Sequence, residues 1–308
     1  MIILLFFGLL VLIVLCGSLY AYRIAFYMPK KHREDPPKPT DPSLVALMDR
    51  LRPLYRKLKA RPCELVSVQS HDGLTLWGRY YHVKDGAPLD IGFHGYRSSA
   101  FTDFCGGSEL SFAMEHNLLL VDQRAHGKSG GSTISFGILE RYDVLSWVRY
   151  ALERFGDDTE ILLYGVSMGA ATVLMAADQP FPGNVRGIIA DCPYSDAMEI
   201  ILHVGRSNPL PQWLIRPFVV LGARIFGGFD VLQWSAEKAV KASKIPILIL
   251  HGEDDAFVPC AMSISAASAN PQIAERHTFP GADHALSYLT DPERYSALVR
   301  DFAARVLQ

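Results

Sequence analysis

The stretch that decides the fold runs from Leu162 to Ala170 and reads Leu-Leu-Tyr-Gly-Val-Ser-Met-Gly-Ala. Its first residues are apolar, which predicts a short buried strand, and the small and apolar residues at its end suit a helix. A glycine lies two positions before Ser167 and another two positions after it. A sharp turn requires this pattern, because a side chain at either glycine would collide with neighbouring backbone. The stretch therefore predicts a turn that lifts the Ser167 hydroxyl clear of a sheet.

A serine hydroxyl is a weak nucleophile, so it needs a histidine to take its proton and a carboxylate to orient that histidine. Both residue types occur downstream, each after a predicted strand. Pro246 to Pro259 contains a buried-type strand that leads into an acidic loop, and Gly281 to Tyr288 follows a further short strand. In chain order the serine comes first, the acidic loop second and the histidine third.

These segments resemble the α/β-hydrolase superfamily, whose patterns His-Gly-x-x-Asp-x-x-Val-Pro and Gly-Ala-x-His match 251–259 and 281–284. The resemblance covers roughly residues 64 to 308. It implies a mostly parallel central sheet with helices on both faces and a short lid insertion, and it assigns Ser167 as nucleophile, Asp255 as acid and His284 as base. Asp254 is the competing candidate for the acid.

An oxyanion formed at Ser167 needs two backbone donors. Met168 follows the serine at the start of the predicted helix, so its N–H is directed toward the developing charge. The resemblance implies that the second donor is the amide of Tyr96, in the loop His94-Gly95-Tyr96 after the strand Leu89 to Phe93. We expect His94 to brace this loop and not to transfer protons.

The remaining elements are predicted from periodicity and turn residues. They are a hairpin of Glu64–Ser70 and Leu74–Tyr81 around His71-Asp72-Gly73, strands at 118–121 and 185–190, an amphipathic helix at about 139–155 and a closing helix from Pro292 to Leu307.

Two further stretches lie near the expected site. The loop Asp122 to Ser129 resembles the family's Asp-x-Arg-Gly-His-Gly-x-Ser, with alanine in place of the first glycine. We interpret Asp122, Arg124 and His126 as an internally bonded loop that shapes the site, and Cys192 as a small buried side chain.

An insertion from about 197 to 239 is rich in large apolar residues, with a concentration of aromatic side chains near Pro209 and Pro211. Part of it must be helices that pack on the sheet. We expect the rest to form a small lid over Ser167 that makes the acyl-binding pocket apolar.

The first 28 residues are predicted to anchor the chain in a membrane. Met1 to Tyr22 contains no charged residue and, at about 1.5 Å per residue, is long enough to cross a bilayer. The alternative is a cleaved signal peptide, but neither a basic n-region nor a small-residue cleavage site is evident.

Residues 29–61 are predicted to be a basic juxtamembrane segment. Between Arg23 and Arg61 there are 11 basic and 4 acidic residues, which leaves 19 basic and 28 acidic residues for 62–308. A stiff spacer is expected from the prolines 36, 37, 39 and 42. After it, apolar residues recur at helical spacing from Leu44 to Leu58, and we leave open whether this helix packs on the catalytic domain or lies on the membrane surface.

Neither a cofactor nor a metal is expected. If His251, Asp255 and His284 bound a metal, they could not activate Ser167, and the sharp turn that presents this serine would have no function. The glycines 127, 130 and 131 lack the ending of a phosphate-binding loop, and an acidic catalytic domain makes nucleic acid an unsuitable partner.

Three function classes remain. The first is an esterase resembling the carboxylesterase and monoacylglycerol-lipase branch, acting on a small acyl ester or lipid-like substrate. The others are a serine peptidase of the aminopeptidase-like branch and a non-catalytic membrane-tethered binding module.

Basic side chains at 23, 30, 31 and 33 follow the span and none precedes it, which predicts a single-pass cell-membrane protein with a cytoplasmic catalytic domain. Dispersed cysteines (63, 105, 192 and 260) favour the same side.

Overall fold

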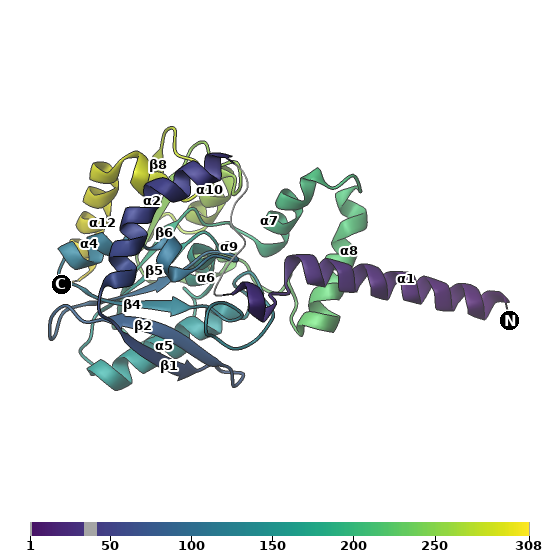
Figure 1. The fold of residues 1–308 in the computed structure, drawn as a ribbon, viewed down its shortest axis with the longest axis horizontal. Helices are drawn as coiled ribbons and strands as arrows, with labels where there is room; N and C mark the ends of the chain where they lie inside the picture. Colours follow the sequence, from purple (N-terminus) through teal and green to yellow (C-terminus); the bar gives the residue numbers. More distant parts are fainter. Residues whose placement is uncertain (1, 34–41, 308) are drawn as a thin grey trace.

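The computed structural model describes residues 2–33 and 42–307. Its centre is an eight-stranded sheet with the order β1-β2-β4-β3-β5-β6-β7-β8 (Figure 1). From β4 to β8 every neighbouring pair is parallel, and β1 and β2 add an antiparallel edge. The strands are β1 Glu64–Gln69, β2 Thr75–Tyr81, β3 Leu89–Phe93, β4 Asn117–Asp122, β5 Ile161–Val166, β6 Val185–Asp191, β7 Ile247–Gly252 and β8 Ala274–Phe279.

The burial of the strands explains why they form at the apolar stretches of the sequence. Every residue of β5 is buried, as is usual for a parallel strand covered on both faces. The predicted hairpin is confirmed, because β1 and β2 pair in register from Glu64 opposite Tyr80 to Gln69 opposite Thr75. The α/β fold with a mostly parallel sheet expected from the sequence is therefore present.

Two hydrophobic cores lie on opposite faces of the sheet, since successive residues of a strand point to opposite sides. Ile161 and Leu163 of β5 belong to the core shared with α5, α6, α9 and α10. Tyr164 and Val166 belong to the core shared with α3, α4 and α12. The helices are α3 Ala100–Asp103, α4 Ser108–Ala113, α5 Glu140–Phe155, α6 Met168–Met175, α9 Ala236–Ala242, α10 Cys260–Ser268, α11 Ser287–Thr290 and α12 Pro292–Val306.

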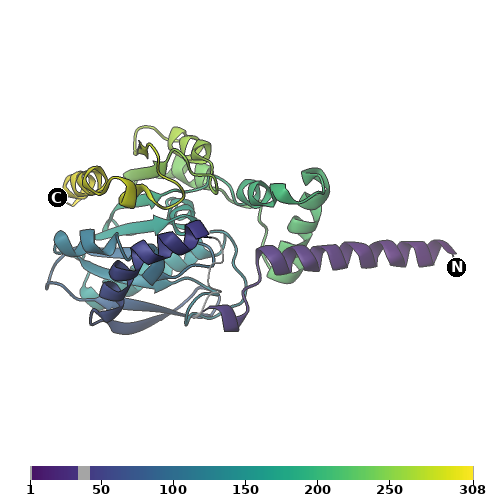
Figure 2. The same ribbon diagram turned by 45° about the horizontal axis from the view of Figure 1, so that its top comes forward.

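Helix α1 (Ile2–Ala25) projects from this body, and its end nearest the sheet lies beside a group of helices between β6 and α9 (Figures 1 and 2). We call this group the cap segment. It consists of α7 Ala197–Val204, η2 Gly205–Ser207, α8 Gln212–Gly222 and η3 Ala223–Gly227. Helix α1 is long and apolar enough to cross a membrane by length and composition.

The chain just after α1 is tied to the catalytic domain by backbone hydrogen bonds. Ile134 donates to the carbonyl of Phe26 at 2.7 Å, and Met28 donates to the carbonyl of Ser132 at 2.9 Å. Arg33 is buried and donates to the carbonyls of Met28, Ser129 and Gly131. A short 3-10 turn, η1 Lys30–His32, lies between these contacts. The root of α1 is thus fixed relative to the sheet.

Helix α2 (Pro42–Ala60) packs on the catalytic domain, which is one of the two alternatives left open by its sequence. Leu58 is fully buried, the ring of Tyr55 lies 5.9 Å from that of Phe101, and Lys57 pairs with Glu109. The predicted spacer prolines 36, 37 and 39 lie outside the described residues, and Pro42 begins the helix.

Candidate active site

Ser167 sits in a strained turn between β5 and α6. Its backbone angles are φ 55° and ψ −116°, a conformation that few non-glycine residues adopt. A β-carbon on Gly165 would lie 2.3 Å from the carbonyl oxygen of Gly169, and one on Gly169 would lie 1.8 Å from that of Phe93. The collisions expected from the sequence are therefore present, and only glycine fits at either position.

The side chains of Ser167, His284 and Asp255 form one hydrogen-bonded chain. Nε2 of His284 lies 2.9 Å from Oγ of Ser167, and Nδ1 of His284 lies 2.7 Å from Oδ2 of Asp255. The three residues follow β5, β8 and β7, whose carboxyl ends meet at one edge of the sheet. A β-carbon on Gly252 would lie 2.2 Å from the carbonyl oxygen of Ala282, so the loops carrying Asp255 and His284 approach closely.

Asp255 is held as a carboxylate. Its Oδ1 accepts the amides of Val258 at 2.7 Å and Phe257 at 3.0 Å, while Nε2 of His251 lies 3.2 Å from Oδ2. Burial alone would raise the pKa of Asp255, but the hydrogen bonds from His251 and His284 outweigh it and lower the pKa to about 2. The stabilisation that this charge gives the fold is therefore present above the unfolded pKa of about 3.9 and is lost as pH falls toward 2.

Asp254, the competing acid, does not join this chain. Its side chain is exposed, and its amide donates to the carbonyl of Ala282 at 3.0 Å. The backbone of the loop therefore directs Asp255 inward and Asp254 outward.

The two predicted oxyanion donors lie on either side of the serine. A β-carbon on Gly95 would lie 3.3 Å from Cβ of Ser167, which places the loop of Tyr96 beside the nucleophile. Asp103 holds this loop by accepting the amide of Gly95 at 2.6 Å and the hydroxyl of Ser98 at 2.5 Å. Within the described part of the chain, neither the Tyr96 nor the Met168 amide donates a hydrogen bond, so both are free for an oxyanion.

His94 braces the neighbouring loop, as its sequence context predicts. Its Nε2 accepts the amide of Gln123 at 3.2 Å and its Nδ1 lies 2.8 Å from the carbonyl of Gly95. The ring of His126 packs edge-on against it with centroids 4.7 Å apart. Nε2 of His126 accepts the amide of Arg97 at 3.0 Å, and burial lowers the pKa of His126 well below its ordinary value. Nε2 of each ring accepts a backbone amide, so both rings brace the loops beside Ser167.

The loop 122–129 is internally bonded, as expected. Arg124 donates two bonds to Asp143, both at 2.7 Å, and two more to Asp72. Burial alone would lower the pKa of Arg124, but these carboxylates raise it. Asp122 pairs with Arg79 at 2.8 Å. These charges position the loop and do not reach Ser167.

Two clusters have metal-ligand chemistry among the residues that the structure describes. They are Cys192 with Asp255 and His284, and His71 with Asp72 and Asp143. Burial raises the pKa of the Cys192 thiol well above its usual value, so the thiol is a poor ligand. In the second cluster the Arg124 guanidinium already neutralises both carboxylates. The donor sets therefore do not fit a resident metal.

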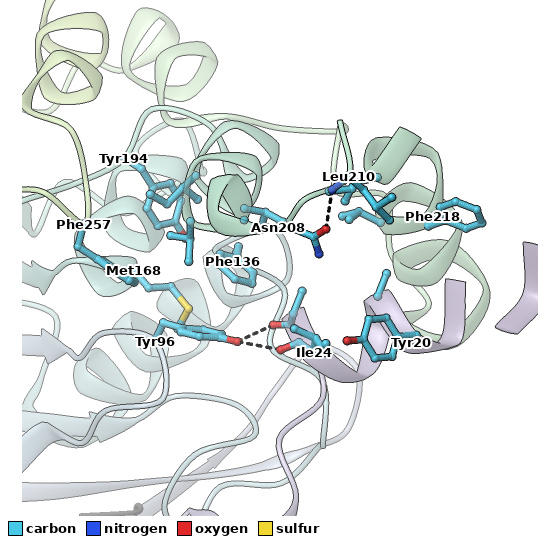
Figure 3. Close-up of a pocket in the computed structure, with 18 of the residues that line it drawn as sticks. Tyr20, Ile24, Tyr96, Phe136, Met168, Tyr194, Asn208, Leu210, Phe218 and Phe257 are labelled. Atoms are coloured by element: carbon cyan, nitrogen blue, oxygen red, sulfur yellow. Dashed lines mark hydrogen bonds between the residues drawn. The ribbon is translucent and has the colours of Figure 1, made fainter. Parts of the chain in front are cut away.

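Ser167 is one of the residues that line a cavity of about 400 Å³. Figure 3 shows this cavity. Met168, Tyr194 and Phe257 line the end near the serine, and the cap segment lines much of the remainder. Helix α1 also contributes to the wall, through Gly17, Tyr20, Ala21, Ile24 and Ala25. The sequence analysis did not assign these residues to the site. The signal was present in the small residues Gly17, Ser18 and Ala21, which are typical of close helix packing in a hydrophobic helix.

Asp191 is a second residue that sequence reasoning missed. It ends β6, is buried, and accepts the hydroxyl of Tyr295 at 2.9 Å. Burial raises the pKa of Asp191 to about 6, against the lowering effects of Tyr295, His251 and His284. Its position directly before Cys192 was the available signal, because polar residues that end parallel strands gather at the site edge.

Comparison with known proteins gives consistent results. A sequence model described as the alpha/beta hydrolase family matches residues 91–298. An uncharacterized protein, YqkD, from Bacillus subtilis is 28% identical over 194 residues, which cover 60% of this chain and 61% of that protein. Protein bem46 from Schizosaccharomyces pombe is 23% identical over 304 residues, or 96% of this chain and 91% of that protein.

Solved structures share the fold. The Pyrococcus furiosus esterase Pf2001 is 22% identical with a TM-score of 0.65, covering 82% of this chain and 95% of that one. Est1E from Butyrivibrio proteoclasticus, solved with ferulic acid bound, is also 22% identical, with a TM-score of 0.60 over 79% of this chain and 99% of that one.

Proposed function

The chain belongs to the alpha/beta hydrolase family, and we propose that it is a membrane-anchored serine hydrolase that cleaves carboxylic esters through an acyl-serine intermediate. The observation that carries this proposal is the hydrogen-bonded chain from Ser167 through His284 to Asp255, at 2.9 and 2.7 Å, opening into an apolar cavity. The esterase structures that share its fold are consistent with it.

In the first half of the proposed reaction, His284 Nε2 accepts the proton of Ser167 as Oγ attacks the ester carbonyl carbon. The carbonyl oxygen becomes an oxyanion and accepts hydrogen bonds from the amides of Met168 and Tyr96. Asp255 orients His284 and stabilises its positive charge. The carbon–oxygen bond to the alcohol then breaks, and the alcohol leaves with the proton from His284.

The second half uses water in place of the serine. His284 takes a proton from the water as the water oxygen attacks the acyl carbon, and the same amides stabilise the second oxyanion. The bond from the acyl carbon to Oγ breaks, Oγ recovers its proton from His284, and the carboxylic acid departs. Ser167, His284 and Asp255 return to their starting protonation states.

An ester is favoured over a peptide by the cavity wall. A substrate amine would need a carboxylate to bind it, and among the described residues that line the cavity there is none. The walls instead carry aliphatic and aromatic side chains. Each substrate methylene that they remove from water contributes roughly 0.8 kcal/mol of favourable transfer free energy.

The test is a set of 4-nitrophenyl esters of increasing acyl length beside amino-acid 4-nitroanilides, assayed with the wild type and Ser167→Ala. We expect labelling of the wild type by a fluorophosphonate, and kcat/KM that rises with acyl length until the cavity is full. Faster cleavage of an anilide than of any ester would identify a peptidase, and equal rates in Ser167→Ala would remove the proposed nucleophile.

We place the catalytic domain on the cytoplasmic side, with α1 as a single span of the cell membrane. Basic residues at 23, 30, 31 and 33 follow the apolar segment, and positive flanking charge is retained on the cytoplasmic side. All five cysteines are free thiols, in keeping with a reducing compartment.

Cys63 provides the test of this orientation, because it is exposed and lies on the catalytic side of α1. A membrane-impermeant maleimide should label it in lysed cells and not in intact cells, and Cys63→Ser should abolish that labelling. Labelling of Cys63 in intact cells would place the catalytic domain outside.

A further inference from the structure

The cavity in front of Ser167 has one wall made by the anchor helix itself. Gly17, Tyr20, Ala21 and Ile24 of α1 line the cavity together with Leu214 and Phe218 of α8. Figure 3 shows Tyr20 and Ile24 on α1 and Phe218 on α8. A water-soluble catalytic domain without α1 would therefore have an incomplete cavity. The helix is part of the binding site as well as a tether.

Helices α1 and α8 touch through small residues. A β-carbon on Gly17 would lie 2.7 Å from the ring of Phe218, and one on Gly222 would lie 2.5 Å from the carbonyl oxygen of Ser18. Glycines at such positions let two helix backbones approach closely, as in helix pairs within membranes. Helix α8 therefore lies at the same depth along α1 as the cavity wall.

The length of α1 sets that depth. Its 24 residues span about 36 Å, but the 15 residues before Gly17 span only about 22 Å. The hydrocarbon core of a bilayer is about 30 Å thick and takes about 20 helical residues. Any 20 consecutive residues of α1 include Gly17, Tyr20 and Ala21, so this part of the cavity wall lies within the membrane if α1 crosses it.

Several side chains that line the cavity are exposed and apolar, as suits a membrane environment. Tyr20 is 66% exposed, Ile24 54% and Leu210 52%, and all three line the cavity. Trp213 at the start of α8 is 75% exposed. Exposed apolar side chains on a hydrophobic helix suit contact with lipid, and tryptophan is enriched where a membrane meets water.

The anchor also reaches the loop that carries a proposed oxyanion donor. The hydroxyl of Tyr96 donates to the carbonyl of Ala25 at 2.9 Å, and Arg97 donates to the carbonyl of Ile24 at 2.7 Å. These carbonyls end α1 and would otherwise lack helical partners. The same cavity is thus lined by α1 at one part and by Tyr96 and Ser167 at another.

We propose that this cavity takes a hydrocarbon chain of a membrane-resident ester lipid, which reaches Ser167 directly from the bilayer along the wall formed by α1 and α8. The proposal rests on the proposed esterase function and names its substrate class. The ester group would stop at Ser167, and the chain would lie between the two helices.

The first experiment makes the cavity smaller by a substitution in the wall that α1 forms. Ala21→Phe adds a ring inside the cavity, whereas Leu19→Phe adds bulk at the same depth on the other side of α1, at a residue that does not line the cavity. Each methylene excluded should lower kcat/KM about fourfold. We expect Ala21→Phe to reduce cleavage of the longest preferred ester at least about tenfold and to move the optimum to shorter chains, while Leu19→Phe retains the wild-type profile. Identical profiles for the two variants would overturn the proposal.

The second experiment does not depend on how a variant folds. The full chain is reconstituted in vesicles, and a long-chain glycerol ester is supplied either in the same bilayer or in separate enzyme-free vesicles. We expect an initial rate at least about tenfold higher for lipid in the same bilayer, with a short soluble ester cleaved equally in both preparations. Equal rates for the two lipid arrangements, with Ser167→Ala inactive, would reject bilayer access and leave the esterase proposal standing. No Ser167-dependent cleavage of any ester would reject both.

Discussion

Behind Ser167, toward the sheet, polar side chains are buried and hydrogen-bonded, whereas in front of it the cavity is walled by apolar helices. Asp255 accepts two backbone amides and pairs with His284, and Arg124 is held by two carboxylates. The front wall relies on the packing of α1 against α8. Directional bonds fix geometry to tenths of an ångström, while apolar walls select by size, so the two regions divide reaction and substrate choice between them.

The largest effect expected is at the nucleophile. Ser167→Ala should lower kcat for every ester by about 10⁴- to 10⁶-fold, because the residual rate comes only from the oxyanion donors and binding. Cavity volume and acyl preference belong to the front wall and should not change. The measurement is turnover of a short ester, with the melting temperature showing that the fold is retained. A fall of less than about tenfold would mean that another group attacks the ester.

The next effect separates the two candidate acids. Asp255→Asn should lower kcat about 10⁴-fold, since an amide cannot hold His284 in the required tautomer. Asp254→Asn is the matched control, because its side chain is exposed, whereas His284 pairs with Asp255. We expect that variant to stay within about twofold of the wild type, as is usual for an exposed substitution. The assignment would be reversed if Asp254→Asn were crippled and Asp255→Asn were active.

The contrast also explains what the sequence could predict. The region behind Ser167 was predictable because each role demands one residue type at one spacing. Gly165 and Gly169 permit the turn, and the match at 251–259 distinguishes Asp255 from Asp254 although both are acidic. Apolar periodicity located the strands for the same reason, since a buried strand such as β5 is apolar throughout.

The front wall was not predictable to the same degree. Apolar side chains in α1 suit lipid, a helix partner and a ligand equally well, so composition alone does not say which of them Tyr20 or Ile24 contacts. The insertion could be identified as apolar, but its pairing with α1 joins segments about 200 residues apart in the chain. Asp191 was missed because its unusual environment comes from burial beside Tyr295, which no local spacing reveals.

A smaller effect should come from Asp191, which lies behind the catalytic chain. Because burial raises its folded pKa to about 6, the folded state binds more protons than the unfolded state between about pH 4 and 6, and stability falls as pH rises through that window. Asp191→Asn keeps an oxygen for the Tyr295 hydroxyl and removes the charge. We expect the variant to be more stable than the wild type at pH 8 by up to about 3 kcal/mol.

Urea unfolding at pH 5 and pH 8 measures this difference. The wild type should lose more stability than Asp191→Asn between the two values, because only the wild type carries a buried charge at residue 191 at pH 8. Parallel losses in the two proteins would show that Asp191 is already ionised at pH 5.

The smallest effect lies where the two regions meet, at the hydroxyl of Tyr96. Tyr96→Phe retains the backbone amide and the ring packed against Phe136, and loses only the hydroxyl's bonds to the end of α1, at 2.9 Å to the carbonyl of Ala25 and 3.4 Å to that of Ile24. One such bond contributes about 0.5–1.5 kcal/mol, so kcat for a short ester should fall about two- to tenfold while KM changes little. The control is Tyr22→Phe, which removes a 2.8 Å bond between the same helix and Thr133, at a residue that does not line the cavity. If both variants lower kcat equally, the anchor acts only by holding the domain in place. A selective loss of kcat in Tyr96→Phe would mean that α1 positions the oxyanion loop. The helix that forms the substrate-binding wall would then also hold the catalytic centre in its active geometry, through the hydroxyl of Tyr96.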